Sequence, residues 1–113
     1  MTNKEYQSVR NGLFAYAQDI MEDKQPAYTG ENEDVLSNFK NMADRFGIDP
    51  LVAWGIYFNK HVDAINSFIK NPELHQGGEP ISSRFADIIN YCALGMALVK
   101  EQKHASESNK IPK

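Results

Sequence analysis

The residues best suited to chemistry lie between Glu79 and Tyr91, inside one of the most apolar helical patterns of the chain. Arg84, Asp87 and Tyr91 recur at spacings of three and four, so a helix places them on one side, with Asn90 beside them. A buried polar group without a partner costs about 1–3 kcal/mol. These side chains therefore either tie helices together or hold a polar ligand, with Arg84 presenting its planar fork to phosphate oxygens.

A second set of candidate residues surrounds Lys60, which stands between Asn59 and His61 in an apolar stretch, one helical turn after Tyr57. A lysine at this place can bind phosphate as a point charge. Alternatively, Lys60 extends to solvent and His61 packs in the core with one hydrogen bond. The sequence leaves both interpretations open.

The third candidate is the segment from Lys24 to Gly30, which is followed by Asn38 in the next expected helix. Tyr28 offers an aromatic face for a base, Thr29 a hydroxyl group and Lys24 a positive charge. On composition alone, the segment is equally typical of an ordinary turn whose tyrosine covers one end of a helical bundle.

Four carboxylates raise the question of a metal site. Glu31 and Asp34 stand three residues apart, and Glu79 and Asp87 can approach them from the last expected helix. Oxygen ligands of this kind suit Mg²⁺, although acidic residues at a helix start more often serve as caps. We therefore assign no catalytic residue and no required cofactor, and Mg²⁺ is the metal ion that these residues would suit.

Composition limits the class of protein. A chain of 113 residues with 42% hydrophobic residues forms one domain with a genuine core. Its formal net charge of −3 argues against direct nucleic-acid binding. The chain lacks a signal-peptide pattern and any window of roughly 18 apolar residues, so we expect a cytoplasmic protein without a membrane partner. The single cysteine, Cys92, is expected to pack as a small hydrophobic residue.

Apolar periodicity predicts an all-α fold with four helices, which have to position these side chains. The first is expected over residues 3–24, ending before Pro26, and is followed by a loop over 26–33. Later helices are expected over 35–46, closed by Gly47; from Asp49-Pro50 to just before Pro72; and from Pro80 to about Lys103. Residues 71–79 are expected to form a mobile connection. The domain then covers residues 1–103, with a disordered tail over 104–113.

Short links between four helices predict a bundle. The last helix is apolar on most of its sides between Phe85 and Val99. It is therefore either the central helix or a helix shared with another subunit. Since four helices of this length barely bury it, a homo-oligomer is favoured over a monomer.

The order of these motifs resembles that of a family of small phage and prophage proteins, the nucleotide modification associated domain, which is loosely similar to the all-α, MazG-like nucleotide pyrophosphatases. The resemblance covers about residues 24 to 100. It rests on the combined order of Tyr28-Thr-Gly30, Asp34-Val-Leu-Ser-Asn-Phe39, Gly47-Ile-Asp-Pro50, Lys60, Glu79 and Asp87-Ile-Ile-Asn-Tyr91. The resemblance implies an all-α, MazG-like fold and a role in phage nucleotide metabolism or counter-defence.

MazG-like enzymes hold magnesium ions with a Glu-x-x-Glu pair and a later Glu-x-x-Asp pair. This chain has Glu31-x-x-Asp34 and Asp87-x-x-Asn90 at the nearest positions, and the lost carboxylates favour binding over two-metal hydrolysis. The leading hypothesis is thus an oligomeric protein that binds a nucleotide or cyclic nucleotide. Its ligand-binding residues would be Lys24, Tyr28, Thr29, Asn38, Lys60, Arg84, Asp87, Asn90 and Tyr91. The alternatives are a magnesium-dependent nucleotide pyrophosphohydrolase and a non-catalytic structural or protein-interaction module.

Overall fold

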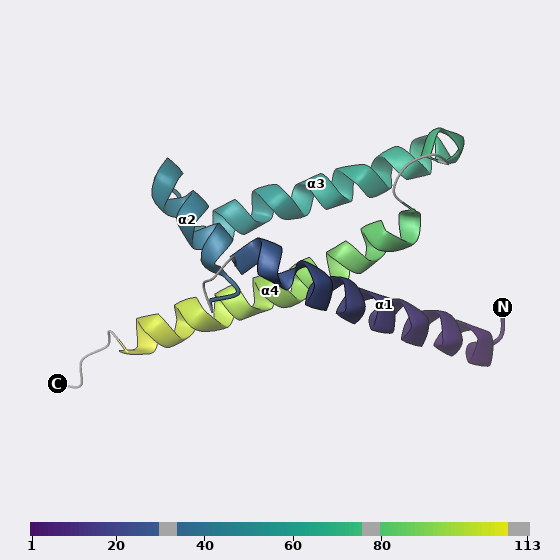
Figure 1. The fold of residues 1–113 in the computed structure, drawn as a ribbon, viewed down its shortest axis with the longest axis horizontal. Coiled ribbons are helices and arrows are strands. Elements are labelled where there is room, and N and C mark those ends of the chain that lie inside the picture. Colours follow the sequence, from purple (N-terminus) through teal and green to yellow (C-terminus); the bar gives the residue numbers. More distant parts are fainter. Residues whose placement is uncertain (30–33, 76–79, 109–113) are drawn as a thin grey trace.

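The computed structural model describes residues 1–29, 34–75 and 80–108, and only the backbone of 24–29, 74–75 and 106–108. The described residues form four α-helices and one 3₁₀ turn, without strands. The elements are α1 (Asn3–Thr29), α2 (Ser37–Phe46), α3 (Pro50–Lys70), the turn Pro72–His75 and α4 (Ile81–Ser108) (Figure 1). The expected all-α, four-helix architecture is confirmed. Within the described part of the chain, no helix combines the length and apolar character needed to cross a bilayer.

Local signals set several helix boundaries. At the start of α1, the Thr2 hydroxyl accepts from the Glu5 backbone N–H at 3.1 Å, while the Thr2 N–H donates to the Glu5 carboxylate at 3.3 Å. This reciprocal pair is a capping box. Gly47 ends α2 in the left-handed conformation, with φ of 66°. The Asp49 carboxylate caps α3 by accepting from the Leu51 N–H at 2.8 Å. The sequence-based predictions for Gly47 and Asp49-Pro50 are confirmed.

Two helices extend further than the sequence predicted. α1 passes through Pro26 to Thr29, so the residues expected in a loop at 26–29 are helical. Pro26 lacks a backbone N–H, so the helix loses one hydrogen bond there. This loss is tolerated because α1 ends only three residues later, at Thr29. α4 continues past Lys103 to Ser108, since no glycine or proline stands in that stretch to stop it. In the expected connection 71–79, residues 72–75 form the 3₁₀ turn and 76–79 lie outside the described residues.

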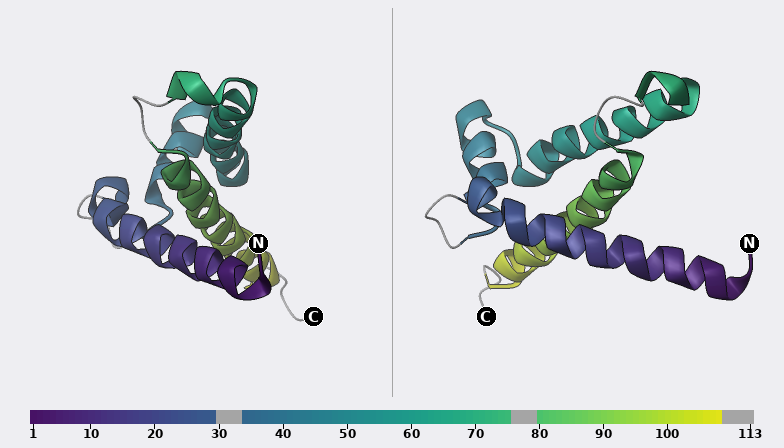
Figure 2. Two further views of the ribbon diagram at one scale, coloured as in Figure 1. Left: turned by 90° about the vertical axis from the view of Figure 1, so that its right-hand side faces the viewer. Right: turned by 45° about the vertical axis from the view of Figure 1, so that its right-hand side comes forward.

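α4 is the central helix of the arrangement. It runs antiparallel to α3 (Figure 1). Three contacts mark the register of the two helices between Asp49 and His61 on the α3 side and between Asp87 and Gln102 on α4. They join Gln102 to Asp49 at 2.8 Å, the Tyr91 carbonyl to the Trp54 indole N–H at 2.8 Å, and Asp87 to His61 at 3.7 Å. α1 crosses α4 from another side, and its amino-terminal turns extend away from the other helices (Figure 2).

The hydrophobic core lies where α2, α3 and α4 meet. Its buried residues are Leu36, Phe39, Tyr91, Leu94 and Leu98, with the partly buried Trp54, Tyr57 and Phe58 packed against them. The Trp54 ring of α3 packs directly against Gly95 of α4, where an added Cβ would lie 2.6 Å from the ring. Only glycine therefore permits this contact. Cys92, which we expected to be packed, is exposed and lines a surface groove with Leu51 and Trp54 of α3.

Candidate functional site

Three of the four candidate residues of α4 join helices. The Asp87 carboxylate is 4% exposed and lies 3.7 Å from His61 Nδ1 on α3. The Asn90 amide donates to the Ala17 carbonyl on α1 at 2.8 Å. Tyr91 is buried, with its ring centroid 4.5 Å from that of His61. These contacts belong to an interhelical polar network. Arg84 is half-buried one turn before this network.

Two other predicted residues, Asn38 and Lys60, lie around the ring of Tyr57, between α2 and α3. Tyr57 lines three cavities of about 70, 280 and 380 Å³. Asn38 borders the first two and Lys60 the third. We call this surface the Tyr57 groove and define it by Asn38, Asn41, Arg45, Tyr57 and Lys60.

The parts of the Tyr57 groove differ in polarity. Asn38, Asn41 and Arg45 line its polar side, while Met42 and Ile56 line the apolar side together with Lys60. Lys60 Nζ lies 5.2 Å from the centroid of the Tyr57 ring, in the range of a cation–π contact. Arg45 is in the last turn of α2, where the helix dipole favours a cation. Two cations, two amides and one aromatic ring thus share a solvent-exposed surface.

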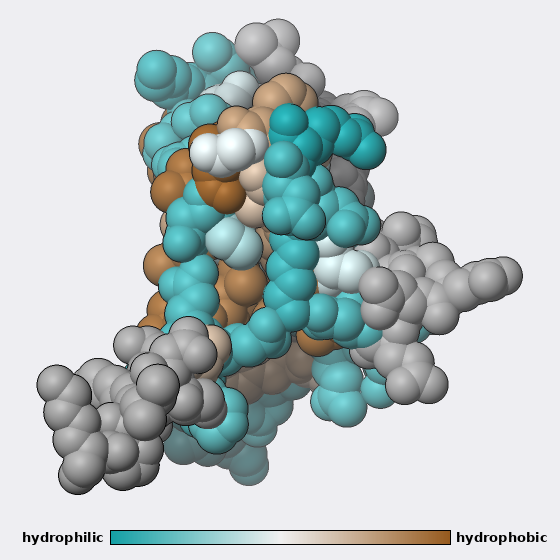
Figure 3. Space-filling view, turned by 90° about the vertical axis from the view of Figure 1, so that its left-hand side faces the viewer, coloured by the Kyte–Doolittle hydropathy of each residue, from teal (hydrophilic) through white to brown (hydrophobic). Residues whose placement is uncertain are grey.

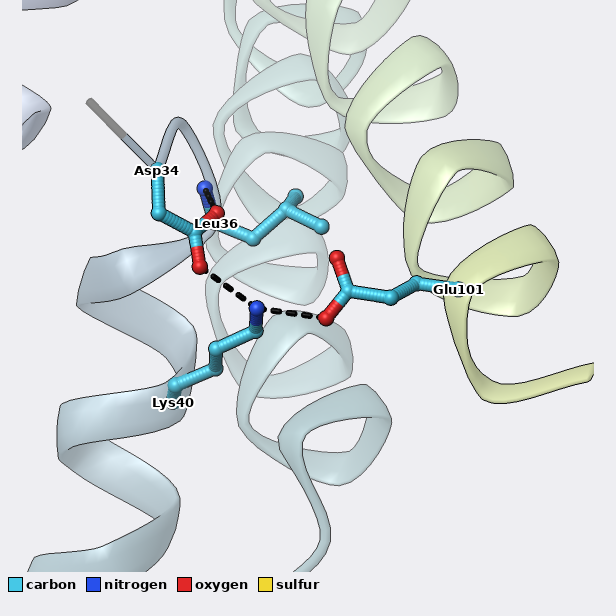
Figure 4. A network of polar contacts seen from close by, with 4 residues as sticks. All are labelled: Asp34, Leu36, Lys40 and Glu101. Carbon is cyan, nitrogen blue, oxygen red and sulfur yellow. Dashed lines mark hydrogen bonds and ion pairs between the residues drawn. The ribbon is translucent and has the colours of Figure 1, made fainter. Parts of the chain in front are cut away.

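A second charged cluster joins α2 to the end of α4. Lys40 Nζ lies 2.5 Å from a carboxylate oxygen of Asp34 and 2.5 Å from one of Glu101 (Figure 4). The Asp34 carboxylate also accepts from the Leu36 N–H at 2.9 Å. The hydrogen bonds from Lys40 and Leu36 lower the pKa of Asp34, and the two carboxylates raise the pKa of Lys40. Asp34 therefore acts as a helix-start residue held by a cation.

The carboxylates considered for a metal ion do not form a cluster among the residues that the structure covers. No group of three or more His, Cys, Asp or Glu side chains that could hold a metal ion occurs there. Asp34 is engaged by Lys40, and Asp87 lies beside His61. Glu31 and Glu79, the other two members of the expected set, lie outside the described residues.

Replacing Lys40 with methionine is expected to lower the free energy of unfolding by less than about 1 kcal/mol at pH 7, because the charged side chains are about one-third or more exposed. The folded-state pKa of Asp34 is lowered, so its contribution is present above its unfolded pKa of 3.8 and is lost as the pH falls further. The pKa of Lys40 is raised, so its contribution is present below 10.5 and is lost as the pH rises through the folded value.

Urea denaturation across pH would check this prediction. The difference between wild type and Lys40→Met should be largest between about pH 4 and 10 and should shrink at both extremes. Lys70→Met, at an exposed position at the end of α3, is the matched control and should show no such window. If the free energy of unfolding of the two variants depends on pH in the same way, the ion pairs of Lys40 do not stabilise the fold.

The sequence identified part of the Tyr57 groove. Asn38 and Lys60 were predicted binding residues, whereas Asn41 and Arg45 were missed. The missed signal is the spacing of 38, 41 and 45, which places three polar residues on one side of α2. The side chains of Lys24, Tyr28 and Thr29 lie outside the description, although their backbone belongs to α1. Comparison with known protein families, curated proteins and solved structures finds no match for the chain.

Proposed function

We propose that the chain binds a nucleotide or a nucleotide-derived ligand in the Tyr57 groove. The main support is the arrangement of Lys60 over the Tyr57 ring, with Asn38 and Arg45 lining adjoining cavities. A nucleotide needs an aromatic surface for its base, cations for its phosphates and amide groups for polar edges. The groove offers all three kinds of group within one surface.

Cavity size supports the same proposal. The two larger cavities, of about 380 and 280 Å³, approach the size of ordinary small-molecule sites. The base would lie against Tyr57 and the apolar wall of Met42 and Ile56, and the phosphates would lie toward Lys60 and Arg45. The cavity of about 70 Å³ is too small for a nucleotide and would hold only water or the edge of a ring.

The motif order agrees with this proposal. Asn38 and Lys60 both belong to the segments that resemble the nucleotide modification associated domain. That resemblance implies a role in phage nucleotide metabolism or counter-defence. In that setting, this chain would sequester a linear or cyclic nucleotide in the cytoplasm. The MazG-like alternative, a magnesium-dependent pyrophosphohydrolase, needs accessible carboxylates. Lys40 engages the Asp34 carboxylate, and the Asp87 carboxylate is buried beside His61. Nucleotide binding without hydrolysis therefore fits the described carboxylates better.

Calorimetric titration with a panel of linear and cyclic nucleotides would test the proposal. We expect one ligand class to bind, and Lys60→Ala or Arg45→Ala to weaken its affinity about tenfold or more, because each removes a charge-assisted contact with phosphate. Tyr57→Leu should weaken it as well, through the lost ring surface. Lys70→Ala, on the same helix but outside the groove, should bind like wild type. Absence of heat for every nucleotide at millimolar concentration would overturn the proposal.

A further inference from the structure

α4 carries an exposed apolar stripe on the side opposite its buried residues. We define the α4 stripe as the residues spaced by four, three, four and three along the helix, namely Phe85, Ile89, Cys92, Met96 and Val99. Phe85, Met96 and Val99 are 45%, 51% and 42% exposed, whereas Leu94 and Leu98 on the opposite side are buried. This spacing is the heptad pattern by which two helices pack together.

The chain exposes more surface than a compact monomer of its mass. Its accessible surface is 8321 Å², against about 6,300 Å² for a compact monomer of this mass. Its radius of gyration is 17.2 Å, against about 13 Å for a compact chain of this length. The excess of about 2,000 Å² exceeds the ~800 Å² that a stable interface takes from each partner. Seen from the left-hand side of Figure 1, hydrophobic side chains reach the surface between hydrophilic ones (Figure 3).

We propose that the α4 stripe is the contact surface for a second copy of this chain, with the two α4 helices antiparallel and paired near Cys92. The proposal is independent of the Tyr57 groove. Cys92 lies at the middle of the stripe, with Phe85 and Val99 seven residues to either side. Pairing centred there buries the whole stripe of both copies and forms a closed, two-fold contact.

Charge and shape favour the antiparallel orientation. The next stripe position after Val99 is Lys103, and a parallel pair would place the two Lys103 side chains against each other. Grooves of about 350 and 360 Å³ border the two ends of the stripe. Val9 and Phe85 line the first, and Leu51 and Met96 line the second. Antiparallel pairing brings the amino half of one stripe over the carboxyl half of the other, so both grooves are covered by apolar side chains.

Oxidative cross-linking of the full chain tests the pairing directly, because Cys92 is the only cysteine. We expect wild type to form a disulfide-linked dimer in high yield at micromolar concentration, since a two-fold contact near Cys92 brings the two thiols within bonding reach. In Cys92→Ser/Val99→Cys, the new thiols lie about 20 Å apart along an antiparallel pair, so cross-linking should fall at least tenfold. Equal cross-linking of this variant would overturn the antiparallel orientation.

A pair of charge substitutions tests the surface itself. Met96→Glu should convert a dimer, measured by sedimentation or light scattering, into a monomer with unchanged helix content by circular dichroism. Ile69→Glu makes the same kind of change at a site on α3 that is 68% exposed, and it should leave the dimer intact. A wild-type monomer at 100 µM concentration or above, a dimer that Met96→Glu leaves intact, or a dimer in which Cys92 does not cross-link would each overturn the proposal.

Discussion

Replacing Trp54 with alanine is expected to lower the free energy of unfolding by about 3 kcal/mol or more. The Trp54 ring fills the space beside Gly95 and stacks on Phe58, with ring centroids 4.9 Å apart. Its indole N–H also donates to the Tyr91 carbonyl at 2.8 Å. The substitution therefore removes packing on both helices and one hydrogen bond between them. For a domain of this size, the melting temperature should fall by roughly 10 °C or more.

Thermal and urea denaturation followed by circular dichroism would measure this loss. Val52→Ala is a suitable control, because Val52 is an exposed apolar residue on the same helix, 54% accessible. Its effect should stay within about 0.5 kcal/mol. Similar losses for the two variants would show that α3 and α4 are not held together at Trp54.

Asp87→Ala is the second substitution with a large expected effect. Its carboxylate is 4% exposed and lies beside His61, so removing it breaks a buried polar contact between α3 and α4. We expect a loss of about 2–4 kcal/mol in the free energy of unfolding. A loss of this size would reduce any ligand binding through the fold, and such a reduction alone would not make Asp87 a binding residue.

The control for Asp87→Ala is Asp63→Ala, which removes an exposed carboxylate from α3 two residues after His61. It should change stability by no more than about 0.5 kcal/mol. A more conservative variant, Asp87→Asn, keeps the shape of the side chain and separates packing from charge. If Asp87→Ala melts like wild type, the carboxylate has no structural role at this interface.

The sequence predicted the helices well because their start and stop signals are local. Gly47 and Asp49-Pro50 act within a few residues of their own position, and the structure places them as expected. The misplaced ends have local causes too. Near a helix end, the one hydrogen bond that Pro26 removes is not enough to stop α1. After Lys103, no glycine or proline stops α4 before Ser108.

The candidate site was harder to predict because it depends on which helix faces meet. Asp87, Asn90 and Tyr91 were correctly placed in an apolar helix, but periodicity does not show whether their partners are ligand atoms or other helices. The structure supplies partners from α1 and α3. Asn41 and Arg45 form a site only after α2 packs beside Tyr57. Cys92 was misjudged for the same reason, since an apolar position is buried only if another element covers it.

An NMR titration of the isotopically labelled protein with nucleotides would test the central claim, binding in the Tyr57 groove, most directly. Amide signals of Asn38, Asn41, Arg45, Tyr57 and Lys60 should shift together with one apparent dissociation constant. The signals of residues 81–90 should move little, because their polar side chains are engaged between helices. Shifts confined to residues 81–90, or no shifts at millimolar nucleotide, would contradict nucleotide binding in the Tyr57 groove.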